Sequence, residues 1–364
     1  MNRQRRAHVK SREGCTQCKE RHVKCNEVHP QCLSCRQKEL MCSFSAPILT
    51  TPLLSQDSLA DLELLDYWHR HHIPPNAARQ ATRLEDDVVR LGFSYPYLLN
   101  AILALAALQL FDEDRSQTRW YIRAVAHRQA AITRARPQFE NLEESHHRAL
   151  LSFSFYTSMY ALAEPLLRPP PPSRDQPNLD PVKELLQAIQ FGRCSRTLVQ
   201  RHLASVSCSD PFLMAKYNPC NLEAIQGLEL RFSQLAWLQG FIKRHCEGQE
   251  KMVCLHAAES LFLSLALLVD NPDDATQLRA IWGWASKVDS AFLDMCSARN
   301  QVALVIFAHF AAVMTLGRGN WYLQGWPTVL LRQIRCFLKD DWEDAIRWPE
   351  EVVFGNQPIL PPAT

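Results

Sequence analysis

Six cysteines near the start of the chain have the spacing of metal ligands. The gaps between them are two, six, six, two and six residues, so the unit C-x2-C-x6-C occurs twice. A CxxC pair at the start of a helix brings two thiolates to one metal, and a third thiolate returns after a short turn. The candidate ligands are Cys15, Cys18, Cys25, Cys32, Cys35 and Cys42.

Two units of three thiolates satisfy two tetrahedral zinc ions only when two sulfurs bridge the pair of metals, with Zn–S distances of ~2.3 Å. The sequence therefore predicts two Zn(II) ions. The alternative is that the N-terminal segment, residues 1–45, which we call the head, is cross-linked by disulfides. Disulfides require an oxidising compartment. The basic start, Met-Asn-Arg-Gln-Arg-Arg, is not followed by an apolar core, so we expect no secretory signal peptide and favour the metal.

This segment resembles the fungal Zn(II)2Cys6 binuclear cluster of transcription factors. In that family the first and fourth cysteines bridge the metals, which implies Cys15 and Cys32 here. Metal binding supplies the folding free energy of so short a segment, so we expect the head to be unfolded without zinc. The motif that carries the resemblance is Gly14-Cys15-Thr-Gln-Cys18-Lys-Glu-Arg21-His22-Val-Lys24-Cys25-Asn-Glu27, then Pro30-Gln-Cys32-Leu-Ser-Cys35, then Cys42.

The residues between Cys18 and Cys25 are mostly basic and suit double-stranded DNA. A short helix here directs the positive end of its dipole toward an anion. The candidate contacts are Lys19, Arg21, His22 and Lys24, and arginine matches the O6 and N7 acceptors of guanine. The resemblance implies a helix that enters the major groove and reads a CGG-like triplet with Arg21 and His22. Many members of the family carry lysine in place of His22, and a neutral histidine offers only one donor.

The charge of the chain is unevenly distributed. Residues 1–45 hold ten Lys/Arg and four Asp/Glu, whereas the rest of the chain holds 30 and 34. A basic head on a mildly acidic body favours a polyanion as the partner of the head. Residues 1–14 form a basic arm, in which Lys10 and Arg12 are further candidate DNA contacts. This arm is a solvated tail, a phosphate contact or a nuclear import signal, and we expect a nuclear protein.

After the cluster domain, 15–42, we expect a linker at 43–57, an all-α body at 58–350 and a tail at 351–364. No sustained heptad follows Cys42, so we place any homodimer contact in the body. Seven prolines predict an exposed loop at 165–181 that interrupts one helical domain or divides two. The body should contain about ten helices, drawn from 58–72, 76–91, 96–111, 116–135, 141–163, 181–205, 221–245, 250–269, 273–295, 298–316 and 327–347.

The body contains several aromatic and apolar blocks: Leu62–Trp68, Tyr95–Leu108, Trp321–Pro327, Trp342 and Arg347–Pro349. In these blocks and their order it resembles the regulatory domain of fungal transcription factors of the sterol uptake control type. This resemblance implies a regulatory unit, and some members bind a sterol in it. It leaves two readings open. Either the body regulates sterol or secondary-metabolite genes through a coactivator or corepressor, or it is a receptor that senses a small apolar, sterol-like ligand. In the second case the protein binds DNA weakly and needs a partner to do so.

Other patterns argue against an enzyme and against a membrane span. The chain has no GxGxxG, GxxxxGK[ST], GxSxG or HExxH, and the DDxxD-like run Asp340–Asp344 favours an exposed helix face over a magnesium site. The apolar stretch Tyr95–Phe111 is too short for a bilayer. We expect the histidines at 69–72 and 146–147 to be solvated or capped, and the cysteines beyond residue 42 to be buried thiols rather than redox sensors. The arginines from Arg115 to Arg136 form a solvated face or an interface with DNA, an acidic coactivator or an acidic loop of this chain.

Overall fold

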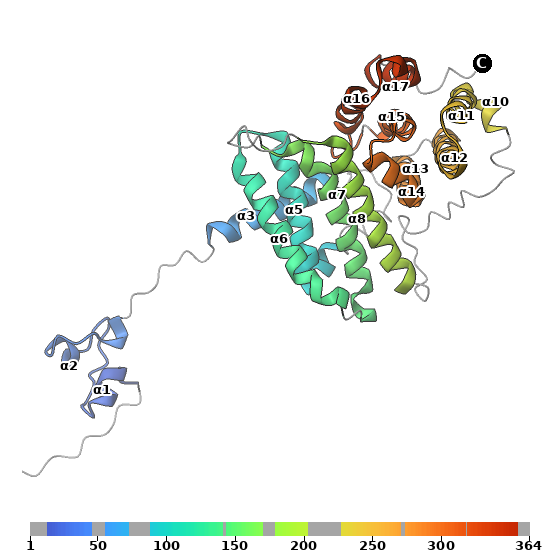
Figure 1. Ribbon diagram of the computed structural model, residues 1–364. Coiled ribbons are helices and arrows are strands. Elements are labelled where there is room, and N and C mark those ends of the chain that lie inside the picture. The colour runs from blue at the N-terminus through green and yellow to red at the C-terminus, as the bar shows by residue number, and fades with distance from the viewer. Residues whose placement is uncertain are drawn as a thin grey trace, which may run out of the picture. The chain divides into compact units, whose positions relative to one another are not determined.

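The computed structural model describes residues 13–45, 55–72, 88–140, 143–169, 179–202, 227–270, 274–317 and 319–355. The chain divides into two compact units, Met1–Glu63 and Leu64–Thr364. Every regular element among the described residues is a helix, and none of these residues forms a strand (Figure 1). The prediction of a small cluster domain followed by an all-α body is therefore confirmed.

The first unit is built from two copies of one supersecondary element. Helix α1 (Thr16–Glu20) follows Cys15, and helix α2 (Leu33–Arg36) follows Cys32, which is 17 residues further along the chain. In each copy a left-handed residue follows the helix, at His22 and at Glu39, both with φ of 52°. A short 3-10 helix, η1 (Ser43–Ser45), comes after the second copy.

The same hydrogen bond closes both copies. The N–H of Val23 donates to the carbonyl of Cys18 at 3.1 Å, and the N–H of Leu40 donates to the carbonyl of Cys35 at 3.0 Å. A left-handed residue followed by such a backward bond is a common way to end a helix and to satisfy its last carbonyls. The repeat in the cysteine spacing is therefore also a repeat in backbone conformation.

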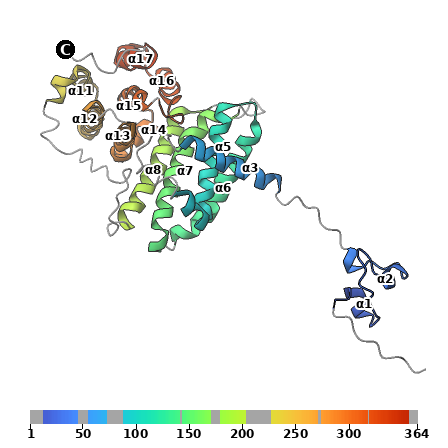
Figure 2. The same cartoon turned by 180° about the vertical axis from the view of Figure 1, so that it is seen from behind.

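The second unit begins within α3 (Gln56–His72), at Leu64. Its first helices form a bundle with α5 (Pro96–Glu113), α6 (Thr118–Glu140), α7 (His147–Leu167) and α8 (Pro181–His202) (Figures 1 and 2). Helix α5 packs against both α6 and α7, and α8 packs against α7. The residues of α5 from Ala101 to Leu108 are all buried, because this helix is apolar on every side. Pro96 occupies the first turn of α5, where its missing N–H costs nothing.

The remaining helices enclose α15 (Gln301–Met314), in which every residue from Val302 to Met314 is buried. Asn300 caps this helix, since its side-chain oxygen accepts from the N–H groups of Val302 and Ala303 at 3.1 and 3.2 Å. The elements around it are α10 (Leu228–Arg231), α11 (Ser233–His245), α12 (Gly248–Asp270), α13 (Asp274–Lys287), α14 (Ser290–Ser297), η3 (Thr315–Gly317), α16 (Trp326–Phe337), η4 (Asp340–Ile346) and α17 (Arg347–Phe354).

A buried tryptophan joins the two groups of helices in the second unit. The indole N–H of Trp326, at the start of α16, donates to the carbonyl of Leu162 in α7 at 2.8 Å. A Cβ on the preceding residue, Gly325, would lie 3.0 Å from the side chain of Leu166. The absence of a side chain at Gly325 therefore allows α16 to approach α7 closely.

Several predicted element boundaries were wrong. The predicted helix 273–295 is two helices, because Asp289 caps α14 through the N–H of Ala291 at 2.9 Å. The predicted helix 327–347 ends at Phe337, and η4 and α17 follow. The proline-rich loop is shorter than 165–181, since Pro165 belongs to α7 and Pro181 begins α8. The helix predicted at 221–245 is interrupted at Phe232, and 221–226, like most of 76–91, lies outside the described residues.

No single described helix is long and apolar enough to cross a bilayer. One bent pair, Ser290–Ser297 with Gln301–Gly317, meets the length and composition criteria together, with an angle of 105° between its two parts.

Candidate metal centre and nucleic-acid interface

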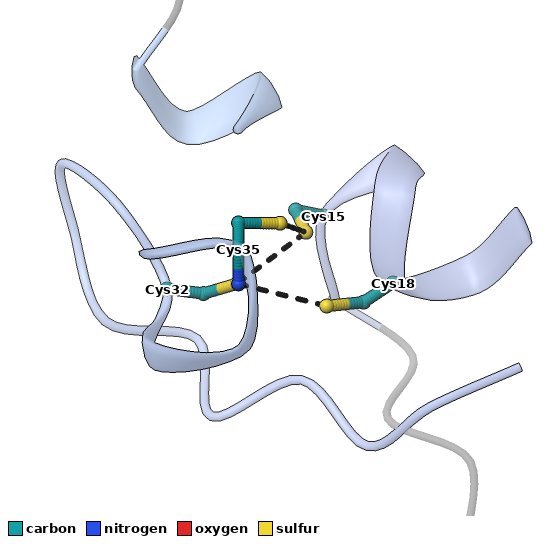
Figure 3. A group of neighbouring side chains, drawn as sticks. All are labelled: Cys15, Cys18, Cys32 and Cys35. Atoms are coloured by element: carbon teal, nitrogen blue, oxygen red, sulfur yellow. Dashed lines mark hydrogen bonds between the residues drawn. The ribbon is translucent and has the colours of Figure 1, made fainter. Parts of the chain in front are cut away.

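Four cysteine sulfurs converge between α1 and α2 (Figure 3). The Sγ atom of Cys15 lies 3.7 Å from that of Cys32 and 3.6 Å from that of Cys35, and the Sγ atoms of Cys18 and Cys32 are 3.6 Å apart. Two sulfurs bound at ~2.3 Å to one tetrahedral metal are about 3.8 Å apart. The separations in the structure therefore suit sulfurs that share zinc ions.

The order of these contacts places two of the sulfurs at the centre. Cys15 contacts the sulfurs of Cys32 and Cys35, and Cys32 contacts the sulfurs of Cys15 and Cys18. Cys25 and Cys42 belong to the same buried core, together with the partly buried ring of Phe44. All six predicted ligands are thus brought together, and they make up nearly the whole core of the unit.

Burial changes the acidity of these thiols in the metal-free form. It raises the pKa of Cys15 well above its ordinary value and the pKa of Cys32 to about 12. For Cys42, burial is outweighed by backbone hydrogen bonds from Cys32 and Phe44, so the pKa falls to about 7. Crowded sulfurs cannot all be anionic without a cation to compensate them, and divalent zinc displaces their protons when it binds.

Backbone N–H groups hold two of the sulfurs in place. The N–H of Cys35 donates to the Sγ of Cys32 and the N–H of Glu27 donates to the Sγ of Cys25, both at 3.4 Å. The peptide bond between His29 and Pro30 is cis, and the His29 ring stacks on Phe44 with 4.3 Å between ring centroids. The hydrogen bonds to these sulfurs are contacts around the metal site that orient the ligands in the folded, metal-bound unit.

Sequence reasoning missed two polar residues that hold the two copies together. The side chain of Asn26 accepts from the N–H of Leu33 at 2.8 Å, and the side chain of Ser43 accepts from the N–H of Thr16 at 2.9 Å. Each residue directly follows the third cysteine of one copy and caps the helix of the other. Their position in the repeat was the available signal, because both types favour helix N-termini.

The four predicted DNA contacts within the described residues are all exposed on one short stretch of chain. Lys19 lies in the last turn of α1, Arg21 caps its C-terminus, and His22 and Lys24 follow. The expectation that the N-terminal end of α1 points to an external anion needs correction. That end begins at Cys15, so its dipole favours the thiolates of the cluster. Lys10 and Arg12 lie outside the described residues.

The other candidate groups in the sequence do not assemble into a site within the described residues, where the four central cysteines are the one group with metal-binding geometry. His69 and His71 bond to carbonyls of their own helix at 2.8 and 2.9 Å. Glu343 and Asp344 of the DDxxD-like run pair with Arg335 and Arg347. Cys246, Cys254 and Cys296 are buried as predicted, and burial raises the pKa of each thiol. The prediction of a buried thiol was wrong for Cys336, which is exposed on the surface of α16.

Comparison with known proteins agrees with this geometry. Residues 13–50 match the family model of the fungal Zn(2)-Cys(6) binuclear cluster domain. The N-terminal segment therefore carries a cluster domain of this family, which binds two zinc ions and is not enzymatic. The prediction of two Zn(II) ions is confirmed.

Two curated proteins are similar to parts of the chain. A Zn(2)-C6 fungal-type transcription factor of Aspergillus fumigatus, afumD, is 34% identical over 127 residues, which cover 29% of this chain and 34% of that protein. A Zn(2)-C6 fungal-type transcription factor of Gibberella zeae is 54% identical over 43 residues, which cover 12% of this chain and 9% of that protein. The chain thus spans about a third or less of these relatives in the matched regions. No solved structure matches it.

Proposed function

We propose that this protein is a nuclear, sequence-specific DNA-binding regulator of transcription, and that its zinc cluster reads CGG-like triplets. The convergence of the sulfurs of Cys15, Cys18, Cys32 and Cys35 carries the proposal, because it builds a rigid support beneath the exposed basic residues of α1. The names of both similar proteins, which are transcription factors, support the same class.

The order of sulfur contacts supports one assignment of the ligands. Cys15 and Cys32 would bridge the two zinc ions, because each contacts two other sulfurs. Cys18 and Cys25 would complete the first ion, and Cys35 and Cys42 the second, since each pair belongs to one copy of the repeat. Bound zinc supplies the folding free energy and carries no catalytic role.

The exposed cations then act on DNA in two ways. Arg21 matches the paired acceptors of guanine in the major groove, and Lys19 and Lys24 suit phosphates as point charges. His22 extends from a left-handed backbone at the end of α1, so its side chain leaves the helix in a direction that a regular turn does not offer. The six thiolates and two zinc ions add a charge of about −2 to a basic head, which remains attractive to DNA.

Selection of bound sequences from random duplexes tests the proposal. The zinc-loaded full chain should enrich a CGG-like triplet, and a chelator should abolish the enrichment. One triplet would indicate a monomer, and two triplets at fixed spacing would indicate a homodimer through the body. No enrichment by a chain that retains both zinc ions would contradict autonomous DNA reading and leave a ligand-sensing receptor with a DNA-binding partner.

The role of the body is a second part of the proposal. The order of its tryptophan and proline blocks supports a regulatory unit of the sterol uptake control type, which acts through a coactivator or corepressor on sterol or secondary-metabolite genes. Thermal unfolding of the full chain with and without ergosterol tests for a small apolar ligand. A rise in the melting temperature of the body that saturates with ergosterol would support sensing, and an unchanged melting temperature would contradict it.

A further inference from the structure

Helix α6 has an outer face that the packing of the bundle does not explain. The helix contains five arginines and, before its last residue, Glu140, no acid. It packs on α5, and its buried residues are Trp120, Ala124, Ala131 and Ala135. It lies at the outer edge of the bundle in both views, so the opposite side is directed to solvent (Figures 1 and 2).

Two branched apolar side chains lie on this outer side. Ile122 is 66% exposed and Val125 is 43% exposed. Their spacing of three residues makes them neighbours on the helix surface. The exposed residues Ala126, Gln129 and Thr133 continue the same strip toward the C-terminal half. The middle of the face is therefore apolar or uncharged.

Arginines border this strip. Arg128, Arg134 and Arg136 are all exposed. The guanidinium of Arg128 lies over the ring of Tyr160 in α7, 5.2 Å from its centroid, so this charge sits at the border of the strip nearest α7. Glu164, an acid on α7, is already bound by Arg168 at 2.8 Å and by Tyr121 at 2.6 Å. The border of the strip therefore carries the positive charges of Arg128, Arg134 and Arg136.

We propose that the outer face of α6 binds an acidic amphipathic helix of another protein. Carboxylates of such a helix pair with Arg128, Arg134 and Arg136, and its apolar residues cover Ile122 and Val125. Arginine around an apolar centre is the composition of a typical protein interface. The strip from Ile122 to Arg136 is about 21 Å long at 1.5 Å per residue, which accommodates some four turns of a partner helix. DNA is disfavoured as the partner, because Ile122 and Val125 would then face phosphates.

The proposal goes beyond DNA reading by the cluster domain, and its test measures peptide binding in the absence of DNA. The probe is a fluorescent 18-residue synthetic peptide rich in glutamate, with leucines at i, i+4, i+7 and i+11. A second peptide of equal composition, with its leucines distributed around the helix, serves as the comparison. Binding to the zinc-loaded full chain is measured by fluorescence anisotropy at physiological ionic strength.

The variants separate the α6 face from other basic surfaces. R134E/R136E should weaken binding of the amphipathic peptide at least tenfold, and I122S/V125S should weaken it severalfold. The control K243E/R244E reverses two exposed charges at the end of α11 and should bind like the unmodified chain. Circular dichroism and zinc content confirm that each variant is folded.

Three results would overturn the proposal. The first is unchanged peptide binding by R134E/R136E, and the second is equal binding of the two peptides. The third is that the unmodified chain binds neither peptide, while the R134E/R136E variant binds an unrelated DNA duplex more weakly than the unmodified chain does. This last result would assign the face to nucleic acid.

Discussion

The side-chain oxygen of Asn26 accepts a hydrogen bond from the backbone N–H of Leu33, 2.8 Å away, and so caps the helix of the other half of the cluster unit. The hydroxyl oxygen of Ser43, in the second half, likewise accepts from the backbone N–H of Thr16 and so caps the helix of the first half. The two halves are thus joined by reciprocal caps as well as by sulfurs. This matters because the apolar side chains of the unit, such as Val23, Leu33 and Met41, are largely exposed and contribute little to a core.

Asn26→Ala should weaken zinc retention. Loss of an N-cap costs about 1 kcal/mol, which is roughly a fivefold change in an equilibrium constant. Competition with a chromophoric chelator measures the effect, and Gln37→Ala, at the exposed end of α2, is the matched control. Equal zinc retention in the two variants would mean that the cap contributes nothing to the metal-bound fold.

Substitution of single cysteines should distinguish bridging from terminal ligands. Cys32→Ser removes a sulfur shared by both metals, so we expect both zinc ions to be lost or strongly weakened. Cys25→Ser removes a ligand of one ion, so one zinc should remain bound more tightly than the other. Zinc content after dialysis and native mass spectrometry report the number of ions per chain. If both variants lost the same number of zinc ions per chain, the assignment of Cys15 and Cys32 as bridges would be contradicted.

Removal of zinc should unfold the first unit and leave the second intact. The core of the first unit consists of the six cysteines with Phe44 packed against them, whereas α15 alone buries thirteen consecutive residues in the second. A strong chelator should therefore abolish DNA binding with little loss of helical circular dichroism. A large, cooperative loss of helix on chelation would show that the body also depends on metal.

The basic residues of α1 should differ in their effect on sequence selectivity. Arg21→Ala should lower affinity for the selected triplet by about 1–3 kcal/mol and relax the preference at one base. Lys19→Ala should lower the affinity for all duplexes by a similar factor and reduce the slope of log affinity against log salt by about one unit. Titrations at several salt concentrations separate the two, and the reverse assignment of effects would exchange their roles.

Acidic pH should destabilise the body through His309. Burial lowers the pKa of this histidine to about 4, and its Nδ1 atom contacts the carbonyl oxygen of Val305 at 2.9 Å. An unfolded chain binds the proton with an ordinary pKa of about 6.5. Stability is therefore complete above pH ~6.5 and falls as the pH drops toward about 4, by up to about 3 kcal/mol.

The matched variant for this prediction is His309→Phe, which keeps a ring against Trp348, whose centroid lies 5.3 Å from that of His309. Thermal unfolding between pH 7 and pH 5 should show a smaller loss of stability in the variant than in the unmodified chain. Equal losses would mean that other groups dominate the acid response.

The amino-acid sequence by itself determined the metal centre. Ligand type and spacing are local properties, and thiolates at C-x2-C-x6-C intervals reach a common metal with little help from the rest of the chain. The positions of Cys15 to Cys42, the two zinc ions and the basic residues after Cys18 therefore followed from reading the chain. The helical character of the body followed equally from the three- and four-residue steps of its apolar side chains.

Only the tertiary structure decided how these parts are used. The cross-capping by Asn26 and Ser43 depends on bringing together residues of opposite halves, which no local pattern encodes. The break after Phe337 depends on how α17 packs against α15 and α16, because the apolar periodicity continues through that position. The break at Asp289, by contrast, has a local cause in the cap that this residue provides. The arginines of α6 were visible in the sequence, but burial of the opposite side against α5 decided that they share an outer face with Ile122 and Val125.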